Sequence, residues 1–228
     1  MLIFDKDFRV NHLDQRHLYL PITDINICVN FDFQGVCDER PDLGVHDIVN
    51  LNIKEEPRAN HFSFWFGFGG SEAVMLDVTQ PGYDFSPWIA KKYNSKNHTC
   101  LDAVVRLSSQ TIPTDVDIGC VLRELDVAQG VTVAHIVDLL RQEGRQRYMF
   151  TSRHMQKLGC RHWIHAVSWD LEREGIAGQG FGDDVLSCLQ IFYARYGIVG
   201  PDGRWIHSGN WTARPEFPYT PVEQGTWY

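Results

Sequence analysis

Leu158-Gly159-Cys160-Arg161-His162-Trp163-Ile164-His165 places a cysteine directly after a glycine, where an apolar repeat begins. The repeat continues to Glu174-Gly175, and a glycine commonly follows the last turn of a helix. Apolar side chains recur at spacings of one, three and four residues, as on the buried face of an amphipathic helix: Trp163, Ile164, Val167 and Leu171. We therefore predict a helix that starts at Cys160 and carries this thiol in its first turn.

A second stretch, Asn60-His61-Phe62-Ser63-Phe64-Trp65, alternates between apolar and polar residues as a β-strand does. The phenylalanines up to Phe68 share one face, and His61, Ser63 and Trp65 share the other. Gly69-Gly70-Ser71 predicts a turn, and residues 73–78 predict a returning strand. If the loop has an odd length, Asp77 lies on the face of His61.

The remaining periodic segments complete an α+β pattern. We predict further strands over Ile25–Phe33, Leu101–Leu107 and Val121–Val127. Thr132 is a candidate N-cap for a helix that ends at Gly144, and Asp183–Tyr196 predicts a last helix. Residues 145–157 suggest a basic and aromatic connector. The expected architecture is an antiparallel sheet packed against helices.

The composition favours one domain over residues 1–228. The chain has 228 residues, of which 43% are hydrophobic and 22% charged, and no linker-like segment divides it. We place the core at about residues 22–197. We expect the aromatic tail, residues 198–228, to wrap this core, because it contains too many aromatic residues for a typical disordered segment.

Charge and hydropathy narrow the partners and the compartment. The net charge of −8, without a strong basic face, argues against a nucleic-acid binder. No apolar run reaches the roughly 20 residues of a membrane span, and the first ten residues have no signal-like apolar segment. The six cysteines form no CxxC pair, which argues against a zinc ribbon or a thioredoxin motif. Without a secretory signal, we expect reduced thiols and a cytoplasmic protein. The sequence does not indicate an oligomeric state.

Cys160, His61 and Asp77 form the candidate catalytic group. A helix start carries roughly half a positive charge, which favours a thiolate at Cys160. His61 would accept the thiol proton, and Asp77 would hold the imidazole in one tautomer. Free N–H groups at the helix start could stabilise an oxyanion. The competing interpretation is an inert structural thiol, because cysteine is among the most buried residue types.

Other residues near these positions are candidates for substrate contact. Trp65 and Ser63 share the face of His61 and would line the pocket, while Arg161 and His162 would lie at the cleft mouth. The spacing of His162 and His165 permits a metal, but catalytic zinc needs three protein ligands and no third one has a diagnostic spacing. We therefore expect no metal and no cofactor.

The segment Gly159-Cys160-Arg161-His162-Trp163-Ile164 resembles Asn-Cys-Glu-His-Phe-Val of the lecithin:retinol acyltransferase family. That family belongs with the permuted NlpC/P60, papain-like proteins, in which a strand histidine precedes a cysteine at a helix start. Asn60-His61-Phe62-Ser63-Phe64, followed by Cys160, has the same order. The resemblance implies a papain-like fold, with Cys160 as nucleophile and His61 as base. Gly159 replaces the asparagine, and Asp77 stands in for the second histidine that these acyltransferases often have.

The chain also resembles an uncharacterised fungal domain family that pairs a Thr-Val-x-x-Ile helix with a Gly-Cys-Arg-aromatic-Trp segment. Thr132-Val133-Ala134-His135-Ile136 and residues 159–163 fit this pattern. The two resemblances together cover about residues 60–196.

Three functions remain open from the sequence. The first is a cysteine-dependent acyltransferase or hydrolase that acts on a small apolar or acyl substrate. The second is a small-molecule cyclase or isomerase of fungal secondary metabolism that uses an aromatic pocket without covalent catalysis, since 12% of the residues are aromatic. The third is a binding module with a silent site.

Overall fold

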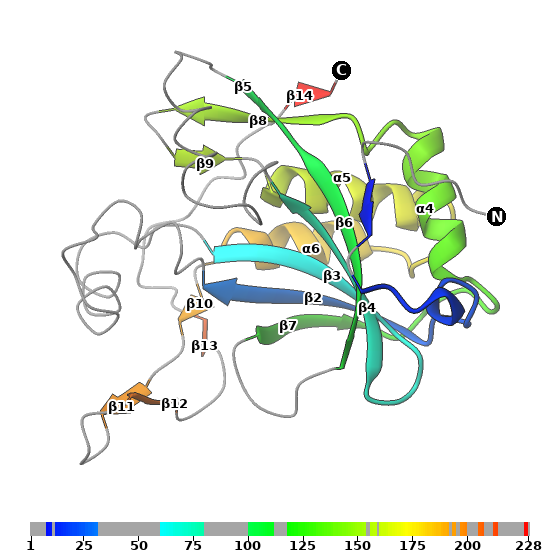
Figure 1. Cartoon of the computed structure of the whole chain (residues 1–228), viewed down its shortest axis with the longest axis horizontal. Coiled ribbons are helices and arrows are strands. Elements are labelled where there is room, and N and C mark those ends of the chain that lie inside the picture. The colour runs from blue at the N-terminus through cyan, green and yellow to red at the C-terminus, as the bar shows by residue number, and fades with distance from the viewer. Residues whose placement is uncertain are drawn as a thin grey trace.

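A six-stranded sheet with the order β1-β6-β4-β3-β2-β7 forms the centre of the fold (Figure 1). In the order of the sheet, its strands are β1 (Phe8–Val10), β6 (Val104–Thr111), β4 (Glu72–Thr79), β3 (Asn60–Gly67), β2 (Asp24–Phe31) and β7 (Ile118–Glu124). Neighbouring strands are antiparallel, except that β1 joins the edge of β6 in parallel. The predicted antiparallel sheet is therefore confirmed, with one parallel edge strand added.

This structure is a computed structural model. It describes residues 8–10, 12–31, 60–79, 100–111, 118–153, 156–158, 160–191, 193–194, 197–199, 205–207, 212–213 and 226–227. Within these residues, no helix is both long enough and apolar enough to cross a bilayer.

The β3–β4 hairpin has the predicted register. Phe64 pairs with Leu76, and Gly67 pairs with Ala73, so residues 68–71 make the turn before β4 begins at Glu72. Phe64 and Leu76 are fully buried and belong to the main hydrophobic core. Because side chains alternate along each strand, Asp77 lies on the opposite face, which is the face of His61.

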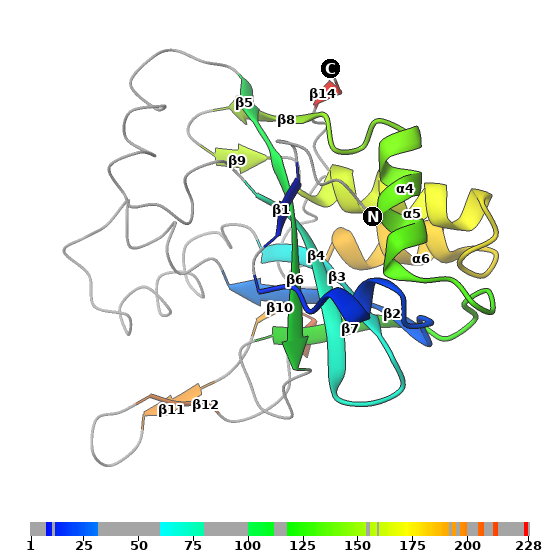
Figure 2. The same cartoon turned by 45° about the vertical axis from the view of Figure 1, so that its right-hand side comes forward.

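Three helices, α4 (Val133–Gln142), α5 (Cys160–Arg173) and α6 (Phe181–Leu189), lie together on one side of the sheet (Figure 2). A short 3-10 helix, η1 (Gln15–Leu18), follows β1. Trp163 of α5 is fully buried and meets the Phe64 ring edge-on, with the centroids 6.2 Å apart. The phenylalanine face of the sheet is thus the face that the helices cover.

The predicted starts of two helices are confirmed. Thr132 caps α4 through a capping box with His135, which satisfies two backbone N–H groups at the helix start. Helix α5 begins at Cys160 and ends just before Gly175, whose φ of 66° suits glycine. The thiol of Cys160 therefore lies in the first turn of α5.

The predicted bounds of the last helix were wrong. Helix α6 begins at Phe181 and ends at Leu189, rather than running from Asp183 to Tyr196. Its start is capped from a neighbouring helix: the carboxylate of Glu172 accepts the backbone N–H groups of Gly180 and Gly182, each at 2.9 Å. A cap that comes from another helix leaves no local signal in the sequence.

The predicted connector over residues 145–157 was also wrong, because it contains β8 (Tyr148–Arg153) and most of β9 (Gln156–Leu158). Strand β8 pairs with β9, with β5 (Cys100–Asp102) and with β14 (Thr226–Trp227). The predicted strand Leu101–Leu107 is therefore divided between two sheets, since β5 belongs to this small sheet and β6 to the main one.

Parts of the C-terminal tail also form strands. β14 returns to pair with β8. Two short antiparallel pairs are β10 (Tyr193–Ala194) with β13 (Thr212–Ala213), and β11 (Gly197–Val199) with β12 (Trp205–His207). The wrapping of residues 198–228 as a whole stays a prediction.

Candidate active site

His61 and Asp77 meet on the face of the sheet opposite the helices. His61 lies near the start of β3, and its Nε2 is 2.5 Å from Oδ1 of Asp77 on β4. The other carboxylate oxygen of Asp77 accepts a hydrogen bond of 2.8 Å from Nη2 of Arg106 on β6. Asp77 is 2% exposed, so a buried carboxylate is held between two cationic partners.

Cys160, which lies next to His61, comes from helix α5 rather than from the sheet. It is the first residue of α5, it is half-buried, and its thiol lies close enough to the His61 side chain for each group to shift the pKa of the other. The start of α5 and the start of β3 lie at the same end of the sheet (Figure 1). Because Nε2 of His61 faces Asp77, Nδ1 is the ring nitrogen left for the thiol. The preceding Gly159 lies outside the described residues.

The electrostatics favour an ion pair between the two groups. Burial raises the pKa of the Cys160 thiol, but the hydrogen bond and charge of His61, with Arg161 and the Phe62 backbone, bring it below its ordinary value. Burial lowers the pKa of His61, yet the charge and hydrogen bond of Asp77, with a smaller contribution from Cys160, raise it well above its ordinary value. Both directions favour thiolate and imidazolium over thiol and imidazole.

Asp77 remains ionised in this setting. Burial raises its pKa, but the charges and hydrogen bonds of His61 and Arg106 outweigh that effect and lower it. An ionised Asp77 can hold the protonated ring of His61 in place, as the acidic member of a triad does. The structure therefore brings together the three residues that the sequence analysis had selected.

Arg106 is the member of this group that sequence reasoning missed. Its Cα pairs with that of Asp77 across β4 and β6. The signal was a charged residue between Val105 and Leu107 in the predicted strand, at the position that alternation assigns to one face. The partner could not be identified, because the pairing of β4 with β6 is not a property of either segment alone.

Trp65 and Ser63 lie on the face of His61, as predicted, and both are buried. The indole N–H of Trp65 donates to Oγ of Ser63 at 3.0 Å. The polar groups of these two side chains are therefore hydrogen-bonded to each other, on the same face of the sheet as His61. Their contact with a substrate stays a prediction.

Arg161 and His162, the other two candidates for substrate contact, differ in their surroundings. Arg161 is 6% exposed, and its guanidinium carbon lies 5.3 Å from the centroid of the Phe62 ring, so it faces the sheet rather than solvent. His162 is half-buried, with Nδ1 3.3 Å from the hydroxyl of Tyr148. Substrate contact by either residue stays a prediction.

His162 and His165 both hold pKa values below the ordinary one. Burial, followed by repulsion from His165 and Arg145, lowers that of His162, and burial lowers that of His165. Nε2 of His165 accepts the indole N–H of Trp169 at 2.7 Å. Across the described residues, no group of three His, Cys, Asp or Glu side chains is placed to hold a metal ion.

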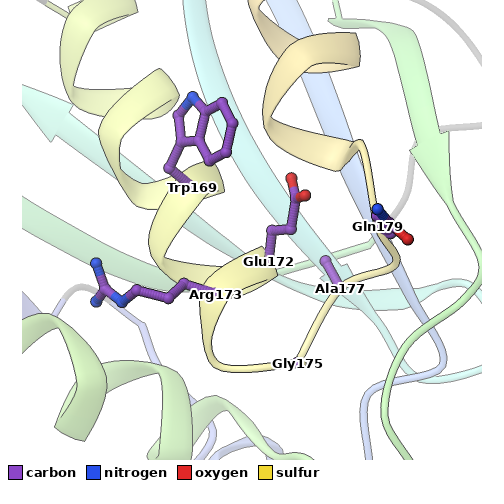
Figure 3. A pocket seen from close by; sticks show the side chains of 6 residues that line it. All are labelled: Trp169, Glu172, Arg173, Gly175, Ala177 and Gln179. Atoms are coloured by element: carbon purple, nitrogen blue, oxygen red, sulfur yellow. The ribbon is translucent and has the colours of Figure 1, made fainter.

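A depression of about 580 Å³ lies at the other end of α5 (Figure 3). Its lining comes from the end of α5 and the segment that leads to α6: Trp169, Glu172, Arg173, Gly175, Ala177 and Gln179. Trp169 follows Cys160 by nine residues on the same helix, a separation of roughly 13 Å along the axis. The depression is therefore distinct from the Cys160 site.

These features define the chain as an α+β protein with a cysteine, histidine and aspartate in contact at a helix start. The chain belongs to the family described as Domain of unknown function (DUF7770), whose profile matches residues 45–228. The matched segment includes His61, Asp77, Arg106 and Cys160. No curated protein matches the chain. No solved structure matches it either.

Proposed function

We propose that this protein is an enzyme that transfers or hydrolyses acyl groups through a covalent intermediate on Cys160. The observation that carries the proposal is the continuous set of contacts from the Cys160 thiol through the His61 ring to the Asp77 carboxylate. A thiolate is the reactive form of cysteine, and a neighbouring imidazolium is one of the two features that stabilise it. The second is the start of a helix, which α5 provides.

The reaction would proceed in two steps. The Cys160 thiolate attacks the acyl carbon, the imidazolium of His61 gives its proton to the leaving group, and a thioester forms on Sγ. His61, now neutral, then removes a proton from water or from an acceptor alcohol or amine, which attacks the thioester and releases Cys160 as a thiolate. Asp77 stabilises the imidazolium whenever it is present. Backbone N–H groups in the first turn of α5 would donate to the oxyanion.

The order of these elements supports a relation to the permuted NlpC/P60, papain-like proteins. A strand histidine and a later cysteine at a helix start occur here in the order that the resemblance implies, with Asp77 in place of the second histidine that those acyltransferases often have. The substrate that we propose is a small apolar or acyl compound. The compartment that suits a free catalytic thiol is the reducing cytoplasm.

Site-resolved alkylation tests the thiol mechanism without a known substrate. Brief exposure to iodoacetamide at neutral pH, followed by peptide mass spectrometry, measures each cysteine separately. Cys160 should react faster than the half-buried Cys188, which serves as the control thiol in the same sample. The His61→Ala variant should slow the reaction of Cys160 by about tenfold or more, since one pKa unit changes the thiolate fraction tenfold. Cys188 should be unaffected.

The outcome also separates the other two functions. If Cys160 reacts no faster than Cys188, and His61→Ala changes nothing, the thiol mechanism is wrong. That result would favour a non-covalent cyclase or a silent binding module. Once a substrate is found, Cys160→Ala should abolish turnover while the circular dichroism spectrum stays unchanged.

A further inference from the structure

Two cysteines other than Cys160 lie opposite each other near the β7 edge of the main sheet. Cys28 of β2 and Cys120 of β7 are Cα partners in the antiparallel ladder. Both are free thiols. The Cys120 thiol donates to Oδ1 of Asn26 at 3.5 Å and to the carbonyl of Leu122 at 3.4 Å. The register shifts between Ile27 and Cys28, so a β-bulge adjoins the pair. Bulges redirect side chains and are frequent near functional positions.

The two thiols differ in exposure and in acidity. Cys28 is 6% exposed, whereas Cys120 faces solvent. The neighbouring Cys28 thiol, together with the backbone of Leu122 and the charge of Arg123, lowers the pKa of Cys120 despite the effect of burial. The neighbouring Cys120 and burial raise the pKa of Cys28. An exposed, acidic thiol beside a protonated partner is the arrangement found in redox-sensing cysteine pairs.

We propose that Cys28 and Cys120 form a reversible oxidation site that hydrogen peroxide or an organic hydroperoxide converts to a disulfide. The Cys120 thiolate attacks the peroxide oxygen, which forms a sulfenic acid and releases hydroxide, or alkoxide from an organic peroxide. The Cys28 thiol then attacks the Cys120 sulfur, and the sulfenic oxygen leaves as water. Overall, two thiols lose two electrons and two protons to the peroxide.

The backbone arrangement suits this bond. Directly opposed residues of an antiparallel pair have Cβ atoms about 4.5–5.5 Å apart, and a disulfide needs about 3.5–4.5 Å. The remaining adjustment is small, and β7 can make it because, among the described strands, it lies at the edge of the sheet and pairs only with β2. Any strain left in the bond would make the disulfide easier to reduce, which is what a reversible site requires.

The test uses the full, reduced chain exposed to a small excess of hydrogen peroxide, then blocked with N-ethylmaleimide and digested. We expect a peptide crosslinked through Cys28 and Cys120, a mass loss of about two units for the two hydrogens removed, and full reversal by dithiothreitol. Oxidation of Cys160 is measured on a separate peptide, so it does not change the measurement of the Cys28–Cys120 crosslink. The matched control, Cys188→Ser, should form the crosslink to the same extent.

Two variants test the assigned roles. In Cys28→Ser, Cys120 should accumulate as a sulfenic acid that dimedone traps, because its resolving partner is gone. In Cys120→Ser, the crosslink should be lost and the buried Cys28 should stay reduced. The proposal is overturned if Cys120 remains open to maleimide while other thiols oxidise, or if it pairs with a cysteine other than Cys28. Because the crosslink is measured in the wild-type chain, the proposal can be tested even if one of the variants does not fold.

Discussion

His61 and Asp77 come from the two strands of one hairpin, and their side chains meet with Nε2 of the ring 2.5 Å from Oδ1 of the carboxylate. The His61 side chain is 24% exposed, whereas that of Asp77 is 2% exposed. The ring therefore reaches solvent and the thiol of Cys160, while its orienting partner is shielded from water. This difference suits a proton carrier that is held by a fixed charge.

Replacing Asp77 with Asn should impair both stability and thiol reactivity. The amide keeps the shape but removes the charge that holds protonated His61, so the pKa of His61 should fall and that of Cys160 should rise. It also leaves Arg106 facing a neutral group in a buried setting, and we expect the free energy of unfolding to decrease by about 1–3 kcal/mol. Urea unfolding measures the stability, and alkylation of Cys160 measures the reactivity.

Asp138→Asn is the matched control for this substitution. Asp138 is largely exposed on α4 and forms a surface pair with Arg141. Exposed pairs contribute little, so its stability should stay within about 0.5 kcal/mol of the wild type. Equal losses in the two variants would contradict the role assigned to Asp77.

The alkylation rate of Cys160 should depend on pH differently from that of an ordinary cysteine. The rate follows the thiolate fraction, and the pKa of Cys160 is lowered through its contact with His61 even though burial opposes the shift. The rate should therefore stay high below the ordinary thiol pKa of about 8.5 and fall only as the pH drops through the lower value. In His61→Ala the profile should shift to higher pH. An unshifted profile would show that His61 does not stabilise the thiolate.

Protonation of His61 should also contribute to stability in a defined pH range. The folded-state pKa of His61 is raised by Asp77 above its unfolded value of about 6.5, despite opposing burial. The folded state thus binds this proton more tightly, and the contribution is fully present below about pH 6.5. It is lost as the pH rises through the raised pKa.

The Cys160→Ala background isolates this effect, because it removes the thiolate that also pairs with His61. Urea unfolding of Cys160→Ala and of Cys160→Ala combined with Asp77→Asn should be compared from about pH 5 to about pH 9. The difference in the free energy of unfolding should shrink toward the alkaline end. A difference that stays constant with pH would rule out the proposed linkage.

Trp163 should anchor α5 to the sheet. Its side chain is fully buried, its ring contacts Phe64, and its indole N–H donates to the carbonyl of Arg145 at 2.8 Å. Trp163→Ala should therefore reduce the free energy of unfolding by about 3–5 kcal/mol. Trp169→Ala is the control on the same helix, since Trp169 is 43% exposed, and its cost should be clearly smaller. Thermal and urea unfolding would rank the two, and similar costs would contradict this packing.

Most local elements could be predicted because their signals lie within a few residues. Alternation along β3 and β4 put Asp77 on the face of His61, and the observed register agrees. Thr132 marked the start of α4, and the repeat after Cys160 marked the bounds of α5. In each case, backbone geometry sets the period, so the sequence pattern reports it directly.

The errors share a different cause. The start of α6 is capped by Glu172 of the preceding helix. Strand β8 pairs with β5 and β14, which lie far from it along the chain. Arg161 was placed at a cleft mouth, yet the packing of α5 on the sheet buries it over Phe62. Periodicity shows that a face is apolar, but it does not show which neighbour will cover it.

By itself, the sequence determined which residues could do chemistry and which faces of their strands and helix they occupy. The tertiary structure alone decided that the start of α5 lies beside the start of β3, so that Cys160 contacts His61. It also decided that Arg106 holds Asp77 and that Cys28 lies opposite Cys120. Hydrogen bonds and ion pairs act over a few ångströms, and only the packing of distant segments brings their partners within that range.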